Sequence, residues 1–288
     1  MRERAQRFDP RQTMQQQDFE IFHYKDPVKE DLAVHHHDFY EIYLFLGGDV
    51  EYWVDGHILH LKPGDLLLIN PMELHRPIVK PDCSVYERIV LWIDKNYLES
   101  LSPDGMSLSR CFDNTIPTHS NLLRPSGTRR PDIMAKMSEL IREYYSKEYG
   151  SHAFACGILL QLMVELNRIA LHNTVPLEQE PQKELSPLIS RVLSHINDHY
   201  NESLSLEGLA AQFFVSKYHL SHEFNKAVGV GVYRYIMLKR LLIAKQLLTD
   251  GQAPGDVYGK CGFGDYTTFF RAFKAEYGIS PGAYTPRR

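Results

Sequence analysis

Cysteine is scarce in this chain of 288 residues, and none of its four copies belongs to a C-x-x-C pair: Cys83, Cys111, Cys156 and Cys261. This scatter argues against both a zinc knuckle and a disulfide framework. No apolar run approaches the roughly 18 residues that a membrane-spanning helix needs, and the N-terminus lacks the apolar stretch of a secretion signal. These absences predict a soluble protein of the reducing cytoplasm, with no membrane partner.

Neither sign of charge dominates, because the formal net charge is only −4. The charges are unevenly placed, however: residues 187–288 hold 12 Lys and Arg against 8 Asp and Glu, so the rest of the chain is acidic. With 43% hydrophobic and 24% charged residues, the composition is that of a globular protein, and the length suffices for two domains. A basic end on an acidic chain indicates nucleic-acid binding at that end.

A helix-turn-helix unit is predicted after Leu204. Ser205 and Ser216 are suitable N-caps for its two helices, and Gly229 ends the second one. The apolar residues of the second helix are spaced to face inward, which leaves an outward polar face of Tyr218, Ser221, His222 and Asn225. Such a face suits the reading of base edges in the major groove, although an ordinary solvated face is the alternative for one helix alone.

The same pattern recurs 49 residues further on, which makes an internal duplication. The cap, the apolar pair and the terminating glycine of the second copy are Asp265, Phe269, Phe273 and Gly278. Its outward residues are Tyr266, Thr267, Phe270, Arg271 and Lys274. A helix from about Val232 to Thr249 is predicted to join the two copies. Two copies are a far more specific signal for DNA binding than either one.

These residues resemble the AraC/XylS family of bacterial transcription regulators. The matching stretches are LSLEGLAAQFFVSKYHLSHEF, the pair Gly262-Phe263, FFRAFK and YGISPGAY. The resemblance implies a homodimer without enzymatic activity that binds double-stranded DNA, answers a small-molecule effector such as a sugar, and has RNA polymerase as a further partner. The chain departs from the family at Tyr258, and Gly255 and Gly259 lower helix propensity there, so we expect this helix to be loosely held.

Short strands are predicted from Phe19 to Ile93, with a hairpin turn at Asp55-Gly56. The number and regular spacing of these strands favour a closed barrel or jelly roll. The expected fold class is therefore α+β with two domains: a β-barrel carrying a helical hairpin, then an all-helical domain with two helix-turn-helix units.

The strand region also resembles the cupin barrel. His35-x-His37-x3-Glu41-x6-Gly48 follows the first cupin motif, and the stretch that ends at His75 approximates the second. If the barrel closes as in cupins, the side chains that converge inside are His35, His37, Glu41 and His75. They are candidate ligands of a divalent metal, and together with Tyr43 they are candidate effector-binding residues. A polar hydrogen-bonded cluster is a third interpretation, and His36 is expected to point away from its neighbours.

Two helices are predicted after an irregular segment from Asp94 to about Arg130, one on each side of Gly150. The second is more apolar than one partner face requires, which indicates a dimer interface at Ile158, Leu162, Met163 and Leu166; burial in the chain's own core is the alternative. The expected domains are an N-terminal arm (1–18), a cupin-like sensing and dimerisation domain (19–173), a linker (174–186) and a DNA-binding domain (187–288).

Three hypotheses of function follow from these observations. In the first, an effector in the barrel controls how two DNA-binding domains are presented. In the second, the chain is a metal-dependent cupin enzyme with an accessory helical domain. In the third, it is a DNA-binding regulator that needs no ligand, and the barrel serves only for dimerisation.

Overall fold

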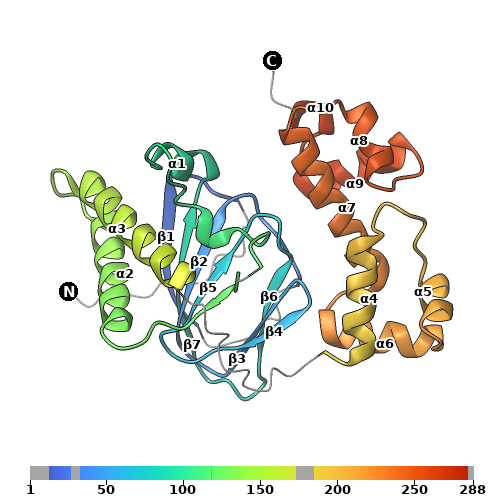
Figure 1. Ribbon diagram of the computed structural model, residues 1–288, viewed down its shortest axis with the longest axis horizontal. Coiled ribbons are helices and arrows are strands. Elements are labelled where there is room, and N and C mark those ends of the chain that lie inside the picture. The colour runs from blue at the N-terminus through green and yellow to red at the C-terminus, as the bar shows by residue number, and fades with distance from the viewer. Residues whose placement is uncertain (1–12, 27–32, 118, 173–184, 285–288) are drawn as a thin grey trace. The chain divides into compact units, whose positions relative to one another are not determined.

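The computed structural model describes residues 13–26, 33–117, 119–172 and 185–284 (Figure 1). The chain divides into two compact units, Met1–Gln182 and Lys183–Arg288. The predicted linker lies outside the described residues except for 185–186, as does the predicted N-terminal arm except for 13–18. In that short piece the backbone N–H of Gln16 donates to the Glu20 carboxylate at 2.7 Å, and Met14 packs against the interior of the first unit.

Two antiparallel sheets form the first unit. One has five strands in the order β1 (Phe19–Asp26), β7 (Tyr86–Ile93), β2 (Tyr40–Gly47), β5 (Leu66–Ile69) and β8 (Leu122–Leu123). The other has three strands in the order β4 (His57–His60), β3 (Val50–Val54) and β6 (His75–Val79). The predicted hairpin turn is confirmed, since Asp55 and Gly56 join β3 to β4 with positive φ angles of 42° and 102°.

Strands β6 and β8 were not predicted. Pro77 lies inside β6, and proline usually excludes a strand because it lacks the backbone N–H that the ladder needs. It is tolerated here because β6 lies at the edge of the three-stranded sheet, where β3 is its one neighbouring strand. The two residues of β8 are too few for any periodicity to show.

Alternation along the strands creates two separate apolar layers. In β2, Ile42 and Leu44 face a layer between the five-stranded sheet and the helices, whereas Tyr43 and Phe45 face the interior between the two sheets. The interior layer is rich in aromatic residues, among them Phe22, Phe39, Tyr52, Tyr86 and Trp92. The strand region is therefore a sandwich-like barrel with an aromatic interior, consistent with the expected fold class.

The segment predicted to be irregular contains short ordered elements. Asp94 caps α1 (Lys95–Ser100) by accepting from the backbone N–H of Tyr97, and a single 3-10 turn, η1, spans Arg110–Phe112. The two long predicted helices are confirmed as α2 (Arg129–Tyr145) and α3 (Ser151–His172). They lie against the outer face of the five-stranded sheet (Figure 1).

Helix α3 is more apolar than the other long helices in the described part of the chain. Contrary to the sequence expectation, it is long and apolar enough to cross a membrane by length and composition. Its apolar stripe is nevertheless used inside the protein, because four predicted interface residues are buried in the layer between sheet and helices: Ile158, Leu162, Met163 and Leu166. This burial favours the alternative reading, in which these residues serve the chain's own core, although Ile158 also lines a surface groove between α2 and α3.

The second unit is entirely helical. Its helices are α4 (Pro187–Asp198), α5 (Leu206–Gln212), α6 (Lys217–Val228), α7 (Val232–Thr249), α8 (Pro254–Lys260), α9 (Tyr266–Tyr277) and α10 (Pro281–Tyr284). The predicted caps are confirmed, because Ser216 accepts from the backbone N–H of His219 and Asp265 from that of Thr268. Gly229 ends α6 in the left-handed conformation, and Gly278 ends α9 in the same way.

Both helix-turn-helix units pack on α7. Tyr235 of α7 contacts Phe224 of α6 edge to face, with 5.6 Å between ring centroids. On the other side, Leu241, Ala244 and Leu248 of α7 share an apolar cluster with residues of α8 and α9. The predicted joining helix therefore holds both units.

A second contact joins the two helix-turn-helix motifs of the helical unit. The Arg240 guanidinium on α7 donates to the backbone carbonyls of Tyr200 and Glu202 at 2.8 and 2.7 Å. Gly262, in the turn after α8, lies so near this segment that a Cβ would meet Asn201 Cα and Tyr200 O at 2.8 Å. The turn of the second helix-turn-helix is thus docked on the loop that leads into the first helix-turn-helix.

Candidate functional site

Helix α6 presents the predicted polar face to solvent. Leu220 and Phe224 are fully buried, so the residues one step away on the helix must point outward. The four outward residues predicted from the sequence are all exposed: Tyr218, Ser221, His222 and Asn225. Their hydroxyl, imidazole and amide groups can donate and accept hydrogen bonds, as contacts with base edges require.

Helix α9 repeats this arrangement, and here two basic residues stand among the predicted outward positions. Phe269 and Phe273 are fully buried, and four of the predicted outward residues are exposed: Tyr266, Thr267, Arg271 and Lys274. Phe270 is only half-buried, and its ring lies 6.2 Å from that of Tyr266. The structure therefore places this phenylalanine between surface and core.

Several basic residues of the helical unit have internal partners. Arg234 of α7 donates to Glu276 of α9 at 2.8 Å. Lys245 is buried with its ammonium near the rings of Tyr277 and Tyr284, 5.1 and 5.9 Å from their centroids. Part of the modest positive charge of this domain is therefore neutralised or buried inside it. Arg271 and Lys274 are exposed, so their charges are available to a ligand.

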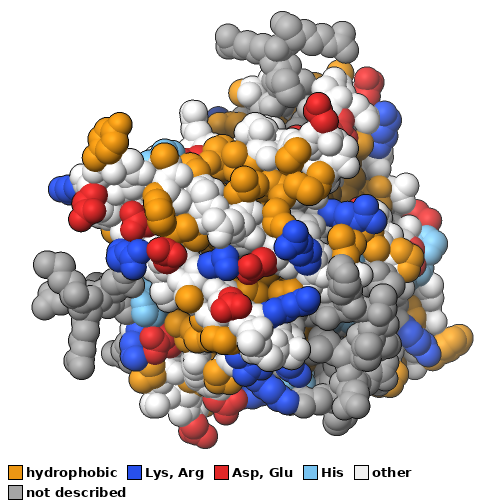
Figure 2. Space-filling model, turned by 60° about the vertical axis from the view of Figure 1, so that its left-hand side comes forward, with side chains coloured by type: hydrophobic (Ala, Val, Ile, Leu, Met, Phe, Trp, Pro, Cys, Tyr) orange, Lys and Arg blue, Asp and Glu red, His pale blue; other side chains and the backbone are white. Residues whose placement is uncertain are grey.

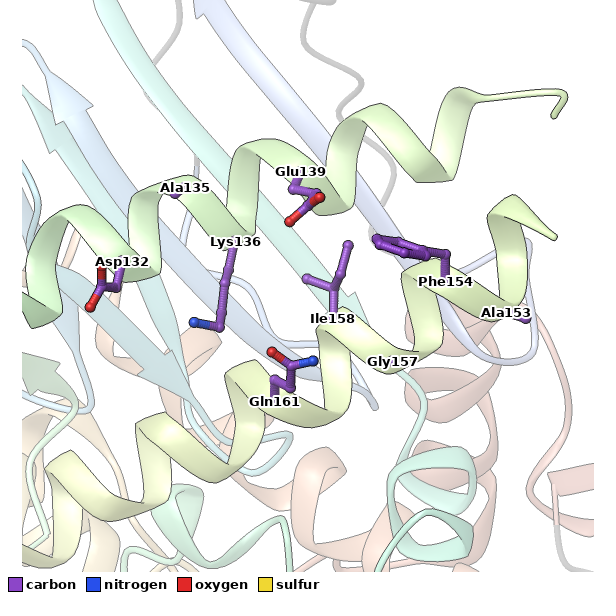
Figure 3. A pocket seen from close by; sticks show the side chains of 9 residues that line it. All are labelled: Asp132, Ala135, Lys136, Glu139, Ala153, Phe154, Gly157, Ile158 and Gln161. Carbon is purple, nitrogen blue, oxygen red and sulfur yellow. The ribbon is translucent and has the colours of Figure 1, made fainter. Parts of the chain in front are cut away.

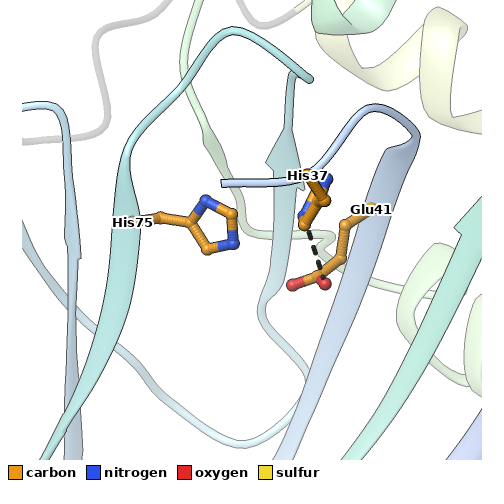
Figure 4. A group of neighbouring side chains, drawn as sticks. All are labelled: His37, Glu41 and His75. Carbon is orange, nitrogen blue, oxygen red and sulfur yellow. Dashed lines mark ion pairs between the residues drawn. The ribbon is translucent and has the colours of Figure 1, made fainter. Parts of the chain in front are cut away.

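Between the two sheets, a buried carboxylate lies beside two imidazoles (Figure 4). Glu41 on β2 accepts a hydrogen bond from the indole N–H of Trp92 at 2.8 Å, and its Oε2 is 3.5 Å from Nε2 of His37. Each of His37, Glu41 and His75 offers one possible metal-ligand atom, and the three atoms lie within 4.8 Å of one another. All three residues are buried.

The backbone fixes the tautomers of these two histidines. Nδ1 of His37 lies 2.8 Å from the carbonyl oxygen of Phe39, and Nδ1 of His75 lies 3.0 Å from that of Glu73. A carbonyl only accepts, so both Nδ1 atoms carry a proton, and an imidazole that is neutral in this tautomer keeps its lone pair on Nε2. Among the described residues, neither Nε2 has a hydrogen-bond partner.

Burial and charge determine the protonation of the group. Burial by itself favours a neutral Glu41, but the neighbouring His37 imidazole and the hydrogen bond from the Trp92 indole outweigh it, and the pKa of Glu41 is lowered. Burial lowers the pKa of His75 well below its ordinary value. At neutral pH the group is therefore an anion beside a neutral imidazole. Lone pairs and a carboxylate that point at one another suit a cation or a ligand rich in hydrogen-bond donors, so these three residues fit a divalent metal.

The remaining predicted barrel residues lie around this group. His35 is half-buried, bonds Ala33 O through Nδ1, and its ring meets that of His75 edge to face at 4.4 Å. It is not among the three potential ligands. The stretch from His35 to His37 is not a strand, which is why His36 is also buried instead of pointing outward.

Tyr43 is buried and its hydroxyl bonds that of Tyr86 at 2.5 Å. The sequence reasoning missed Trp92, the partner of Glu41. Its signal was the alternation along β7, which places Trp92 on the interior face, and in the strand register Glu41 pairs directly with it.

A groove of about 490 Å³ lies on the helical hairpin (Figure 3). Lys136 and Glu139 line it from α2, and Phe154, Gly157 and Gln161 from α3. The phenylalanine is exposed, as are Leu160 and Leu171 of α3. Figure 2 shows the side of the molecule that carries this hairpin, where apolar and charged side chains are interspersed.

Two family profiles match the chain. The AraC-like ligand binding domain matches residues 20–163, and a helix-turn-helix domain matches residues 209–287. Among curated proteins, the HTH-type transcriptional activator RhaS of Enterobacter sp. (strain 638) is 26% identical over 254 residues, covering 86% of this chain and 85% of that protein. RhaS of Escherichia coli O139:H28 is 23% identical over 252 residues, with coverages of 87% and 86%.

Two solved structures are also similar to this chain. ToxT from Vibrio cholerae O395 aligns with 94% of this chain and 98% of its own, at 11% identity and a TM-score of 0.37. The DNA-binding domain of AdpA, solved with a target DNA, covers 34% of this chain and 88% of its own, at 26% identity and a TM-score of 0.33. The profile matches and the curated relatives, which are transcription regulators and not enzymes, show that this chain belongs to the AraC family, with an AraC-like ligand-binding domain followed by a helix-turn-helix domain.

Proposed function

We propose that this transcription regulator responds to a small-molecule effector bound between the two sheets. The observation that carries the proposal is the pair of buried Nε2 atoms, on His37 and His75, that lack hydrogen-bond partners among the described residues. An unsatisfied buried polar atom costs roughly 1–3 kcal/mol, and a ligand that donates hydrogen bonds removes this cost. The proposed effector-binding residues are His35, His37, Glu41, Tyr43 and His75.

The available groups favour an effector with several hydroxyls. Two lone pairs and the Glu41 carboxylate accept hydrogen bonds, while the surrounding rings of Tyr52 and Trp92 offer apolar faces. Hydroxyl donors combined with a C–H surface describe a sugar or another polyol. A sugar is therefore the effector class that we propose to test first.

The natural reporter of binding is the indole that contacts the site. The two tryptophans, Trp53 and Trp92, both belong to the first unit, and only the latter bonds Glu41. We expect an effector to raise the unfolding temperature of the full chain by mass action and to change the tryptophan fluorescence. His37→Ala should abolish both responses, while His57→Ala, which removes an exposed histidine of β4, should keep them.

DNA binding provides the second measurement. The effector should change the affinity of the full chain for its operator, and His37→Ala should remove that change without removing binding itself. Operator affinity that is indifferent to every sugar and polyol tested would support the alternative of a ligand-independent regulator.

A divalent metal ion is a second candidate for the same place. Two ligand atoms at about 2.0–2.2 Å from one ion can be at most about 4.4 Å apart, and the separation of 3.5 Å between His37 Nε2 and Glu41 Oε2 lies within this limit. Backbone carbonyls hold both histidines in the tautomer that metal ligation needs. The proposed ligands are His37, Glu41 and His75, with His35 as a neighbour that is not among them.

Cobalt titration distinguishes the two candidates. If the site takes a metal, Co²⁺ should produce a saturable visible absorption at one equivalent, and His75→Ala should abolish it while His57→Ala keeps it. If the effector is organic, the fluorescence response to a sugar should survive exhaustive chelation. A protein that binds no Co²⁺ at neutral pH contradicts the metal proposal and leaves the first proposal intact.

The DNA contacts are assigned to the outward faces of α6 and α9. We place the reading of base edges and phosphates on Tyr218, Ser221, His222 and Asn225 of the first unit, and on Tyr266, Thr267, Phe270, Arg271 and Lys274 of the second. The support is that all of these residues except the half-buried Phe270 are exposed on helices whose opposite faces are buried.

A homodimer is proposed to form through the exposed side of the helical hairpin, in place of the buried residues first assigned. This surface offers Phe154 and Leu160 beside the groove at Gly157. The double change Phe154→Ser and Leu160→Glu should shift the mass measured by light scattering to that of a monomer. RNA polymerase in the cytoplasm is the further partner proposed for such a regulator.

A further inference from the structure

Phe214, in the turn between α5 and α6, has a backbone conformation that phenylalanine rarely adopts. Its φ is 57°, and the only other non-glycine residue with positive φ in the described part of the chain is Asp55. The turn is closed by backbone hydrogen bonds, from Phe214 N–H to Ala211 O at 3.2 Å and from Val215 N–H to Ala210 O at 3.0 Å. This is the helix-ending geometry in which glycine is usual, because a side chain crowds the backbone there.

The second helix-turn-helix unit provides an internal comparison. The turn after α8 is closed by the same pair of bonds, from Gly262 N–H to Gly259 O at 3.1 Å and from Phe263 N–H to Tyr258 O at 3.0 Å. Its left-handed residue is Gly262, with φ of 79°. The same turn is thus built once with the residue that it favours and once with phenylalanine. Turn formation alone does not account for Phe214.

Packing within the unit does not account for it either. The side chain of Phe214 is 93% exposed. The preceding residue differs, because the Phe213 ring lies 5.8 Å from that of His195 and under the guanidinium of Arg191. An aromatic ring kept in water on a strained backbone position gains its favourable contacts outside this unit.

The position of the ring indicates which partner it meets. Phe214 stands two residues before Ser216, the N-cap of α6, and the first turn of that helix carries Tyr218, which is 77% exposed. The Lys217 ammonium lies 5.5 Å from the centre of the Tyr218 ring. The entry to α6 thus combines two exposed rings with a cation. The first residues of a recognition helix are those that meet base edges, and rings beside cations suit sugars, thymine methyls and phosphates.

We propose that the Phe214 ring packs against operator DNA, on deoxyribose and thymine methyl groups at the edge of the major groove that α6 enters. This inference rests on the proposed role of α6 as a reading helix. The ring contributes apolar contact, while Lys217 contributes the neighbouring phosphate contact. The strained turn holds the ring outward, at the place where the helix meets the groove.

The test uses the full chain and the duplex that the wild-type protein enriches from a random double-stranded library. Phe214→Gly removes the ring and suits the turn, so we expect operator binding to weaken about tenfold, equivalent to about 1.4 kcal/mol, with no fall in unfolding temperature. Phe214→Asn, which also tolerates this conformation, should behave alike. Phe214→Tyr should bind within about threefold of the wild type because it keeps the ring.

Salt dependence separates the two contacts at the entry to α6. Lys217→Ala should reduce the slope of log affinity against log salt by about one unit, because a phosphate contact is lost. Phe214→Gly should leave this slope unchanged. Tyr149→Ala, which removes a fully exposed ring from the other unit, is the matched control and should bind like the wild type.

Each other outcome overturns the proposal in an identifiable way. If Phe214→Gly binds the operator normally while activation of transcription is lost, the ring meets a protein. If Phe214→Gly lowers the unfolding temperature, the ring supports folding. Ser221→Ala and His222→Ala show which proposal has failed. If they weaken binding and Phe214→Gly does not, only the assignment of the Phe214 ring is wrong. If none of the three variants affects binding, α6 does not contact the DNA.

Discussion

Arg271 and Lys274 are exposed on neighbouring turns of α9, but they differ in what they can recognise. A guanidinium is a planar fork that can donate two parallel hydrogen bonds to O6 and N7 of one guanine. An ammonium is a compact charge that suits a phosphate in any sequence. The same helix face can therefore carry one residue for specificity and another for affinity.

Arg271→Ala is expected to cost roughly 1–3 kcal/mol of operator binding and to relax the preference at one base pair. Lys274→Ala should instead weaken binding to all sequences similarly and lower the salt dependence. Selection of binding sites from a random library, repeated with each variant, measures both effects. An Arg271→Ala protein that selects the wild-type site with unchanged base frequencies contradicts the assignment.

The exposed positions of α6 and α9 could be predicted from the sequence because helical periodicity relates every outward position to a buried one. The site in the barrel was harder to predict from the sequence. His37, Glu41 and His75 followed from a motif, yet the exclusion of His35 depends on a path that leaves the strand geometry before β2. Trp92 was missed because its contact with Glu41 depends on the pairing of β7 with β2, and register between distant strands is not visible in one sequence.

At the scale of single elements, α8 is the least typical helix of its unit. It has seven residues, two of them glycines, and Ala253 at its N-cap offers no side-chain hydrogen bond. Its anchor is Val257, which is fully buried. The expectation of a loosely held helix remains a prediction, and the surroundings of the two glycines make it testable, because a Cβ at Gly255 or Gly259 would meet nothing within 4 Å.

Gly255→Ala and Gly259→Ala should each stabilise the helical unit by up to about 1 kcal/mol, because alanine favours the helix and has room at both positions. Tryptophan fluorescence follows the first unit, which contains both tryptophans, whereas far-UV circular dichroism follows the helices of both units. The part of the circular dichroism transition that does not coincide with the fluorescence change therefore reports the helical unit. A gain seen by fluorescence alone would mean that α8 is not the element affected.

Gly262→Ala is expected to act in the opposite direction. A Cβ there would lie 2.8 Å from Asn201 Cα and from Tyr200 O, which are backbone atoms that cannot turn aside, and φ is positive. We expect a loss of roughly 2–4 kcal/mol from this strain and overpacking, measured by the same two signals. Gly264→Ala, two residues away with no atom within 4 Å of its Cβ, is the control and should cost much less.

For the whole molecule, the two-domain α+β class could be predicted because strand alternation and helical periodicity occupy separate halves of the chain. The dimer residues could not, since an apolar helix has the same pattern whether it covers a sheet or meets a second subunit. Ile158 and Leu162 of α3 cover the sheet. Only the packing of α3 on the strands decides between these readings.

The close approach of Gly262 to the Tyr200–Asn201 backbone has a consequence for the operator. This contact and Arg240 fix the distance between α6 and α9 and their relative orientation. The two DNA segments that these helices are proposed to contact must therefore keep a constant separation and a constant rotational phase. One base pair inserted between the segments turns the second by about 34–36° around the duplex axis. We expect binding to collapse with that insertion, and an added full turn of about 10 base pairs should not restore it. Recovery of binding at a full turn, measured by competition between duplexes, would show that the distance between α6 and α9 can change.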